Sequence, residues 1–536
     1  MTTVCEYLIE KLYSIGVSEI FGVPGDFNFE ILSAIEENPH THWIGCCNEL
    51  NASYACEGYG RIKGAAACVT TYGVGELSAI NGIAGAYAQN VPVIQITGMP
   101  KTEILNKGIK IHHSFADGRW NMYFNAYKQV SEYAVILNTQ NASLEIQKAI
   151  HIALTEKKPV YMGIPQDVAK SQIKISDFNP DIMGLKTNAA ELILDKIKAS
   201  SKPLLMFDSL IQIFNLEKEA EEVVNRIQIP FITTTMGKGC IDEENEFFAG
   251  VFEGSLMNKT AEQLYCEADL ILAFGLIWTD FNIGFFSLPE YKDKIINIRK
   301  HDIVINTETI RINSPKLLLD ELIKKSTSKK YDFIKPEINM PKQFPDKLTC
   351  ESAFKIITNF LQEKDVIIAE TGMSSLGIIN CKLPKGACLI TQALYSSIGW
   401  ALPAAFGAAM ADTTNRTILF TGDGSLQLTV QEISSMCRYN VKPLIFILNN
   451  DGYTIERLLS ETPESKYNDI AKWNWQHLAD LFCTDILHAK CSTTKELRSS
   501  LRSITTEKPV IIEIILEKMD MPPLALKLYE WLNKKS

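Results

Sequence analysis

Two apolar segments near the C-terminus, each ended by a glycine-containing turn, constrain the fold most strongly. Thr417–Thr421 runs into Gly422-Asp423-Gly424-Ser425, and Leu444–Leu448 runs into Asn449-Asn450-Asp451-Gly452. Apolar residues recur at helical spacing between the two segments: Leu426, Val430, Ile433 and Cys437. A strand, a helix and a second strand predict a right-handed βαβ unit, and its two strands are parallel.

Both turns of this unit therefore lie at the same edge of the sheet, where open α/β sheets bind their ligands. Asp423, the side-chain oxygen of Asn450 and a backbone carbonyl near Gly452 are hard oxygen donors that suit Mg²⁺. Glycines let the backbone approach closely, and the N–H groups that open the helix can bind a phosphate. Taken singly, each turn is also an ordinary loop or hairpin signal; their pairing favours a shared Mg²⁺–diphosphate site.

The same alternation of strand and helix runs through the chain and predicts parallel sheets covered on both faces. With 536 residues, several domains are expected. Asp177–Thr187 reads as one linker, and Ser326–Tyr331 with the prolines up to Pro345 as a second. We therefore expect an α/β protein of three doubly wound parallel-sheet domains, spanning residues 1–178, 188–326 and 346–536.

The amino-acid composition argues against several classes of binding partner. Hydrophobic residues make up 46% and charged residues 22%, and the net charge of −10 comes without a basic stripe, so nucleic acid and anionic membrane partners are not expected. Two charge-poor stretches, Leu77–Pro100 and Ala393–Ala411, contain prolines, glycines and polar residues and read as buried elements rather than membrane spans. Thirteen cysteines without a CxxC pair favour reduced thiols in a cytoplasmic protein.

Other candidate residues are ambiguous from position alone. Glu49 is a first-turn acid of a helix, Asp26 a turn residue after Pro24-Gly25, and the His112-His113 pair a loop feature without a third metal ligand at a suitable spacing. Glu456 reads as a helix-start acid. Gly73-Val-Gly75 lacks the third glycine of a dinucleotide loop, so an NAD site is not predicted.

Several long motifs resemble thiamine-diphosphate enzymes, and in particular their pyruvate/indolepyruvate decarboxylase branch, which also includes phenylpyruvate and branched-chain 2-oxo acid decarboxylases. The motifs are Gly-Asp-Gly-Ser-Leu-Gln-Leu-Thr-Val-Gln-Glu (422–432), Asn-Asn-Asp-Gly-Tyr-Thr-Ile-Glu (449–456), Val-Pro-Gly-Asp-Phe-Asn (23–28), Asn-Glu-Leu-Asn-Ala (48–52), Gly-Val-Gly-Glu-Leu-Ser (73–78) and His112-His113. The resemblance implies pyrimidine-binding and diphosphate-binding domains at the two ends, a Rossmann-like middle domain, and a homodimer or dimer of dimers with shared active sites.

The resemblance also implies roles. Glu49 would bond the pyrimidine and favour removal of the thiazolium C2 proton, and Ile398 would hold the cofactor bent, with the carbonyl of Ser396 at the aminopyrimidine. Asp26, His112, His113 and Glu456 would orient the substrate and move protons, as imidazole and carboxyl groups can near neutral pH. Mg²⁺ would be bound by Asp423, Asn450 and Gly452. The remaining implied cofactor contacts are Thr371, Gly424, Ser425, Tyr453, Thr454 and Ile455.

The implied activity is non-oxidative decarboxylation of a 2-oxo acid to an aldehyde and CO₂, with the thiazolium as electron sink. An acetolactate-synthase-like carboligase is the alternative, and the histidine pair, which offers a proton, argues against it. The implied substrate pocket leaves pyruvate and larger branched or aromatic acids open, because Ser375 is small where several relatives carry a bulkier group. Its residues are Phe281, Thr371, Ser375, Leu376 and Ile455. Met373 and Ser460–Lys466 depart from the family pattern.

Overall fold

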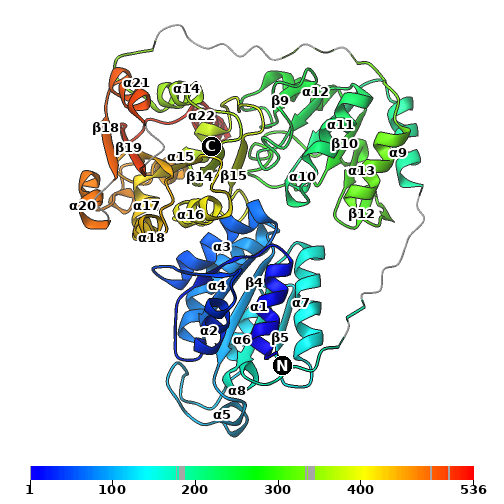
Figure 1. The fold of residues 1–536 in the computed structure, drawn as a ribbon. Coiled ribbons are helices and arrows are strands. Elements are labelled where there is room, and N and C mark those ends of the chain that lie inside the picture. Colours follow the sequence, from blue (N-terminus) through cyan, green and yellow to red (C-terminus); the bar gives the residue numbers. More distant parts are fainter. Residues whose placement is uncertain are drawn as a thin grey trace.

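In a computed structural model, the chain forms three α/β units (Figure 1). The structure describes residues 2–176, 178–179, 188–331, 333, 335, 344–482, 486–504 and 508–535. Most of the first predicted linker and part of the second lie outside these residues. The prediction of three α/β sheets is confirmed, with one departure in the middle unit.

The N-terminal unit contains a six-stranded parallel sheet in the order β2-β1-β3-β4-β6-β5. Its strands are β1 (Glu19–Gly22), β2 (His42–Gly45), β3 (Ala66–Thr71), β4 (Val93–Met99), β5 (Tyr133–Ile136) and β6 (Val160–Pro165). Its helices are α1 (Val4–Ser14), α2 (Phe29–Glu37), α3 (Glu49–Lys63), α4 (Val74–Ala88), α5 (Thr102–Lys107), α6 (Met122–Tyr127), α7 (Ala142–Glu156) and α8 (Gln166–Ala169). A capping box of Thr3 and Glu6 starts α1.

The middle unit has a seven-stranded sheet in the order β13-β12-β11-β10-β7-β8-β9. Its strands are β7 (Pro203–Phe207), β8 (Phe231–Thr233), β9 (Phe248–Val251), β10 (Leu270–Phe274), β11 (Ile295–Ile298), β12 (Asp302–Ile305) and β13 (Glu308–Arg311), and its helices are α9 (Ala189–Ala199), α10 (Leu210–Ile213), α11 (Glu217–Ile227), α12 (Lys259–Glu267) and α13 (Pro315–Lys325). β12 and β13 run antiparallel, so the prediction of a purely parallel sheet is wrong at this edge. Asn306 turns the hairpin with a φ of +53°.

The C-terminal unit repeats the parallel architecture in the order β15-β14-β16-β17-β19-β18. Its strands are β14 (Val366–Ala369), β15 (Cys388–Thr391), β16 (Thr417–Gly422), β17 (Leu444–Asn449), β18 (Leu487–Cys491) and β19 (Val510–Ile515). Its helices are α14 (Cys350–Thr358), α15 (Met373–Ile378), α16 (Ala401–Ala411), α17 (Asp423–Thr429), α18 (Glu432–Arg438), α19 (Thr454–Leu459), α20 (Leu478–Phe482), α21 (Thr494–Ser503) and α22 (Pro523–Lys535).

The predicted βαβ unit is present, and β16 and β17 are adjacent and parallel, with Gly422 paired to Leu448. Its connection is not the single helix that the apolar spacing predicts, because α17 and α18 are separated at Val430 and Gln431. Thr429 and Val430 are β-branched and lower the local helix propensity. The Thr429 hydroxyl also donates to the carbonyl of Gly399 at 2.7 Å, a contact outside the helix.

Helices α3 and α16 pack against each other where the N-terminal and C-terminal units meet (Figure 1). A Cβ on Gly58 would lie 2.0 Å from the carbonyl oxygen of Ala404, and one on Gly407 would lie 1.8 Å from that of Ala55. The two helix backbones therefore touch, and only glycine permits this approach. One hydrophobic cluster extends through both units, with Phe21 edge-on to Phe406 at 6.0 Å.

The two charge-poor stretches form α4, β4 and α16, as expected for buried elements. Among the described residues, no helix is both long and apolar enough to cross a membrane. In the described part of the chain, eleven cysteines are free thiols, most of them buried or half-buried. Cys437 forms a disulfide and departs from the predicted reduced state.

A buried carboxyl lies between the middle and C-terminal units. Glu253 is 2% exposed, and burial raises its pKa from 4.5 to about 8, although Lys238 and the Asn380 side chain oppose the shift. Folded protein therefore holds this proton more tightly than unfolded protein does, and stability falls as pH rises from 4.5 toward 8.

We expect Glu253→Gln to remove this loss, because the amide carries no charge at any pH. Relative to the variant, wild type should lose roughly 2–3 kcal/mol between pH 6 and pH 9. Thermal unfolding at the two pH values measures the effect as a widening difference in Tm. Glu244→Gln, at a carboxyl that is 62% exposed, is the matched control. Equal pH dependence in wild type and Glu253→Gln would contradict the prediction.

Candidate active site

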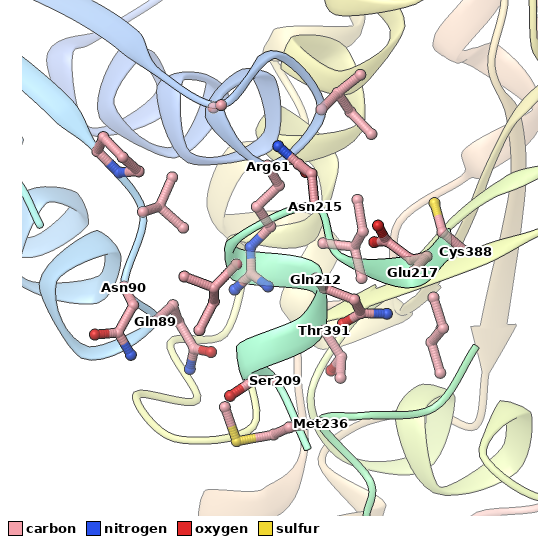
Figure 2. A pocket seen from close by; sticks show the side chains of 18 residues that line it. Arg61, Gln89, Asn90, Ser209, Gln212, Asn215, Glu217, Met236, Cys388 and Thr391 are labelled. Carbon is pink, nitrogen blue, oxygen red and sulfur yellow. The ribbon is translucent and has the colours of Figure 1, made fainter. Parts of the chain in front are cut away.

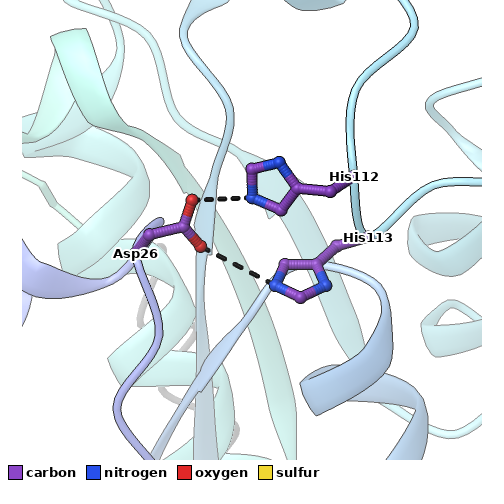
Figure 3. A group of neighbouring side chains, drawn as sticks. All are labelled: Asp26, His112 and His113. Carbon is purple, nitrogen blue, oxygen red and sulfur yellow. Dashed lines mark hydrogen bonds and ion pairs between the residues drawn. The ribbon is translucent and has the colours of Figure 1, made fainter.

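Asp26, His112 and His113 come together at the edge of the N-terminal sheet (Figure 3). The Nε2 atom of His112 lies 2.8 Å from Oδ2 of Asp26, and that of His113 lies 3.7 Å from Oδ1. Asn28 shapes the aspartate loop by accepting from the N–H of Gly25 at 2.9 Å and donating to the carbonyl of Val23 at 3.0 Å. One carboxylate therefore faces two imidazoles that are partly open to solvent.

Two local features position the histidines. Phe27 stacks on His112 with ring centroids 5.0 Å apart, and His113 has a φ of +60°. A Cβ on Gly73 would lie 2.1 Å from the carbonyl oxygen of His113, so the start of α4 must be a glycine. Asp26, 86 positions from His112 in the sequence, brings a carboxylate within 4.8 Å of both histidines, a potential third ligand that the sequence spacing did not indicate.

Glu49 is the first residue of α3, whose N-cap Asn48 accepts a hydrogen bond from the N–H of Asn51 at 2.8 Å. A Cβ on Gly75 would lie 3.1 Å from Oε1 of Glu49 and 3.1 Å from Cγ2 of Thr71. The buried hydroxyl of Thr71 has no hydrogen-bond partner among the described residues. The glycine thus lets the start of α4 lie close to a carboxylate and an unpaired hydroxyl.

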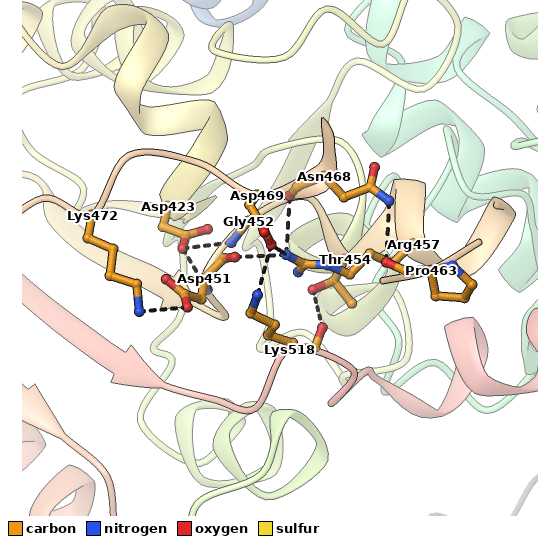
Figure 4. Close-up of polar contacts among 10 residues, drawn as sticks. All are labelled: Asp423, Asp451, Gly452, Thr454, Arg457, Pro463, Asn468, Asp469, Lys472 and Lys518. Atoms are coloured by element: carbon orange, nitrogen blue, oxygen red, sulfur yellow. Dashed lines mark hydrogen bonds and ion pairs between the residues drawn. The ribbon is translucent and has the colours of Figure 1, made fainter. Parts of the chain in front are cut away.

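Asp423 lies at the carboxyl edge of the C-terminal sheet as predicted, directly after β16 (Figure 4). Its Oδ2 accepts from the N–H groups of Asp451 at 2.9 Å and Gly452 at 3.2 Å, and its Oδ1 accepts from Gly424 at 2.9 Å. The two predicted turns are therefore joined. Asn450 is 4% exposed, and its Oδ1 has no hydrogen-bond partner in the described part of the chain.

These donors fit a divalent cation. Burial raises the pKa of Asp423 to about 6 although three backbone N–H groups lower it, so a nearby cation would stabilise the carboxylate. The unpaired buried oxygen of Asn450 is a neutral hard ligand, and such an atom is costly to leave without a partner. Gly424 lets the Tyr453 ring pack directly against the start of α17, since a Cβ there would lie 2.5 Å from that ring.

Ser396 and Ile398 lie in the loop between β15 and α16. Ser396 has a φ of +53°, and Ile398 is 37% exposed. The buried carboxyl of Glu370 anchors this loop by accepting from the N–H groups of Gly399 at 3.1 Å and Ala401 at 3.3 Å. Burial raises the pKa of Glu370 to about 8 against these donors.

The predicted pocket residues lie around α15 and α19. Phe281, Leu376 and Ile455 join one hydrophobic cluster, in which Phe281 and Ile455 are partly exposed. Ser375 is fully buried, and its hydroxyl donates to the carbonyl of Gly372 at 3.0 Å. Met373, at 7% exposure, is in the same cluster. Thr371, next to Gly372, is half-buried.

Helix α19 carries the last group of predicted residues. Glu456 is exposed, and the buried Thr454 donates its hydroxyl to the carbonyl of Lys518 at 2.7 Å (Figure 4). Ser425, in the first turn of α17, is 7% exposed.

Among the described residues, no hydrogen bond or ion pair joins Asp26, His112, His113 or Glu49 to the second group of Asp423, Asn450 and Glu456. We refer to these two groups as the N-terminal and C-terminal half-sites.

A cavity of about 220 Å³ lies elsewhere, where the three units meet (Figure 2). Arg61 and Asn90 of the N-terminal unit, Ser209 and Asn215 of the middle unit, and Thr391 of the C-terminal unit are among its lining residues. None of the predicted site residues lines it, so this cavity is separate from the half-sites.

Three family models match consecutive parts of the chain. Residues 2–118 match the N-terminal TPP binding domain of thiamine pyrophosphate enzymes, residues 190–314 the central domain, and residues 370–514 the C-terminal TPP binding domain. Pyruvate decarboxylase of Candida glabrata is 36% identical over 97% of this chain and 96% of its own length. The chain belongs to the thiamine-pyrophosphate-dependent 2-oxo acid decarboxylases.

Other relatives match this chain over a similar share of its length. Pyruvate decarboxylase of Kluyveromyces marxianus is 37% identical over 98% of this chain and 97% of its own length. Isozyme 1 of pyruvate decarboxylase from Saccharomyces cerevisiae is 36% identical over 97% and 96%. The resemblance inferred from the motifs is thus confirmed, and this decarboxylase is an enzyme of the carboxy-lyase type.

Sequence reasoning missed several residues that shape the half-sites of this decarboxylase. Glu370 follows β14 directly, so the rule that placed Asp423 at the carboxyl edge could also have found it. Thr71 is the last residue of β3, so the same rule could have found it. Arg457, which is buried in α19 at 1% exposure, carried no signal in the sequence, because a charged residue in a helix is normally exposed.

Proposed function

We propose that this decarboxylase converts a 2-oxo acid to an aldehyde and CO₂ without oxidation, using thiamine diphosphate and Mg²⁺. The observation that carries the proposal is the Asp26–His112–His113 cluster, which offers protons at the edge of the N-terminal half-site. Such groups suit a reaction that ends by protonating carbon rather than by joining it to a second carbonyl. Relatives named pyruvate decarboxylase support the same class.

Asp423, the Asn450 side chain and the carbonyl of Gly452 would bind Mg²⁺, since their donor set suits a hard cation. Gly424 and Ser425, at the start of α17, would lie against the diphosphate, with Tyr453, Thr454, Ile455 and Thr371 lining it. Glu49, the Ser396 carbonyl and Ile398 would hold the pyrimidine end. When bound, the cofactor supplies the electron sink that decarboxylation requires.

The side chains of the chain itself would manage protons. Glu49, whose carboxylate lies close to Gly75, would hold a proton at the pyrimidine edge. Asp26 would keep His112 and His113 oriented through its two carboxylate oxygens, so that an imidazole can deliver a proton to the product. Glu456 would orient the substrate from the opposite half-site. Phe281, Ser375, Leu376 and Ile455 would bound the substrate side chain together with Thr371.

We further propose that two copies of the chain complete each active site, as a homodimer or a dimer of dimers. Several apolar side chains near the half-sites are exposed in one chain, and a second copy would cover them: Val74 (56%), Leu77 (39%), Ile398 (37%) and Leu428 (49%). A cytoplasmic location is proposed from the many free thiols.

A substrate panel tests the function. Purified protein with thiamine diphosphate and Mg²⁺ should release an aldehyde from pyruvate, from a branched 2-oxo acid or from an aromatic one. The preference should be modest, because each added methylene changes binding by about 1–3 kcal/mol. Aldehydes and hydroxyketones are quantified together by chromatography. No aldehyde from any acid would overturn the proposal, and hydroxyketone as the main product would favour a carboligase.

A further inference from the structure

Arg457 is a fully buried arginine one position after Glu456 in α19. It is 1% exposed, and its Nη2 donates to the carbonyl of Asp451 at 2.8 Å, to that of Asn468 at 3.2 Å and to Oδ1 of Asp469 at 3.0 Å (Figure 4). A Cβ on Gly452 would lie 2.6 Å from the same nitrogen, so the guanidinium packs directly against that backbone. A buried cation requires such partners.

The loop that Arg457 holds is the one that contacts Asp423. The N–H groups of Asp451 and Gly452 both donate to Oδ2 of Asp423, while the carbonyl of Asp451 points at the guanidinium. The peptide units of this loop thus connect Asp423 on one side with Arg457 on the other. Asn450 and Gly452 of this loop are proposed metal ligands, so their placement depends on the same contacts.

The guanidinium also joins α19 to the segment that follows it. The carbonyl of Asn468 accepts from both Arg457 and the N–H of Tyr453, the latter at 3.0 Å. Asp469 accepts in addition from Lys518 at 2.8 Å, next to the carbonyl that receives the Thr454 hydroxyl. Three segments therefore meet at one side chain, beside the region 460–466 where the sequence departs from the family pattern.

Fold stability alone explains this burial poorly. The Nη1 of Arg457 is buried without a hydrogen-bond partner among the described residues, and desolvating an incompletely paired charge opposes the gain from its other contacts. Residues that orient metal ligands through hydrogen bonds, by contrast, change metal affinity by about 10–100-fold when they are replaced.

We propose that Arg457 is a positioning residue that fixes the Asn450–Gly452 loop to helix α19, so that divalent metal affinity and the placement of Glu456 depend on one buried guanidinium. The inference rests on the proposed Mg²⁺ site and adds a residue that acts through its ligands.

Mn²⁺ binding, followed by electron paramagnetic resonance with saturating thiamine diphosphate, tests the inference without using activity. Arg457→Met should weaken Mn²⁺ binding at least 10-fold, and Arg457→Lys should lie between wild type and Arg457→Met because it keeps the charge but offers fewer donors in a fixed plane. Lys472→Met is the matched control, since Lys472 pairs with the Asp451 carboxylate at 2.9 Å but is 80% exposed. It should stay within 2-fold of wild type.

Thermal unfolding and circular dichroism of the apoproteins separate the positioning role from a structural one. A folded Arg457→Met protein with wild-type Mn²⁺ affinity would overturn the inference. If Arg457→Met does not fold, Arg457→Lys decides by the same comparison, and wild-type affinity in that folded variant likewise overturns it. Failure of wild type to bind Mn²⁺ with thiamine diphosphate would instead refute the proposed metal site, so the two failures are distinguishable.

Discussion

Glu49→Gln should lower kcat by about 10²–10⁴-fold, because the amide cannot exchange a proton with the pyrimidine edge of the cofactor. The substitution keeps the size of the side chain and its place at the start of α3 beside Gly75. Cofactor binding should weaken much less than kcat falls, since the other proposed contacts remain. Steady-state aldehyde release and titration with thiamine diphosphate measure the two effects separately.

Glu36→Gln provides the control for this prediction, because Glu36 is an exposed carboxylate in the same unit and should leave both measurements unchanged. Activity of Glu49→Gln within a few-fold of wild type would show that Glu49 is only a first-turn acid of α3, the reading that its position alone favoured.

Asp423→Asn should abolish tight binding of Mg²⁺ and thiamine diphosphate, with a loss of activity of at least about 10²-fold at millimolar Mg²⁺. Asp423 supplies the negative charge of the proposed ligand set, and an amide nitrogen would also face N–H donors where the carboxylate now accepts from Asp451, Gly452 and Gly424. Calorimetric titration with Mg²⁺ and cofactor measures binding, and assays at rising Mg²⁺ measure any recovery. Unaltered Mg²⁺ dependence would place the metal elsewhere.

The two inactive variants together test whether active sites are shared between copies. If each site combines the N-terminal half of one copy with the C-terminal half of another, a hybrid of Glu49→Gln and Asp423→Asn chains has one intact site and one doubly altered site. Random assortment into dimers should then restore about one quarter of wild-type activity. A mixture that exchanges subunits yet stays inactive would indicate that each site is built within one chain.

The parallel architecture was predictable because strand and helix periodicities are local and each strand ends in a clear turn. The pairing of β16 and β17 followed from this pattern, and it brought Asp423 to the loop after β17 as expected. The break between α17 and α18 was not predictable from apolar spacing. The β-branched Thr429 and Val430 lie at the break, and the contact of Thr429 with Gly399 joins it to a distant part of the chain.

Contacts between distant segments limited the prediction of the site. Asp26 and His112 are 86 positions apart, and no local spacing indicates that one carboxylate faces both histidines. The alternation of strands and helices in the middle region predicts parallel strands and does not indicate the β12–β13 hairpin, which turns at Asn306. Only the resemblance to known enzymes pointed to Ile398 and Ser396, whose loop is held by the buried Glu370.

The backbone contact between α3 and α16 would have a geometric consequence if two copies share the active sites as proposed. Glu49 opens α3, and Ile398 precedes α16 by a few residues, yet with shared sites the two residues of one chain serve different reaction centres. At Gly58 and Gly407 the two helix backbones touch, and no side chains lie between them. The directly packed helix pair would then fix the distance between the two active sites of the dimer. A displacement of the backbone at one cofactor would therefore be transmitted to the other.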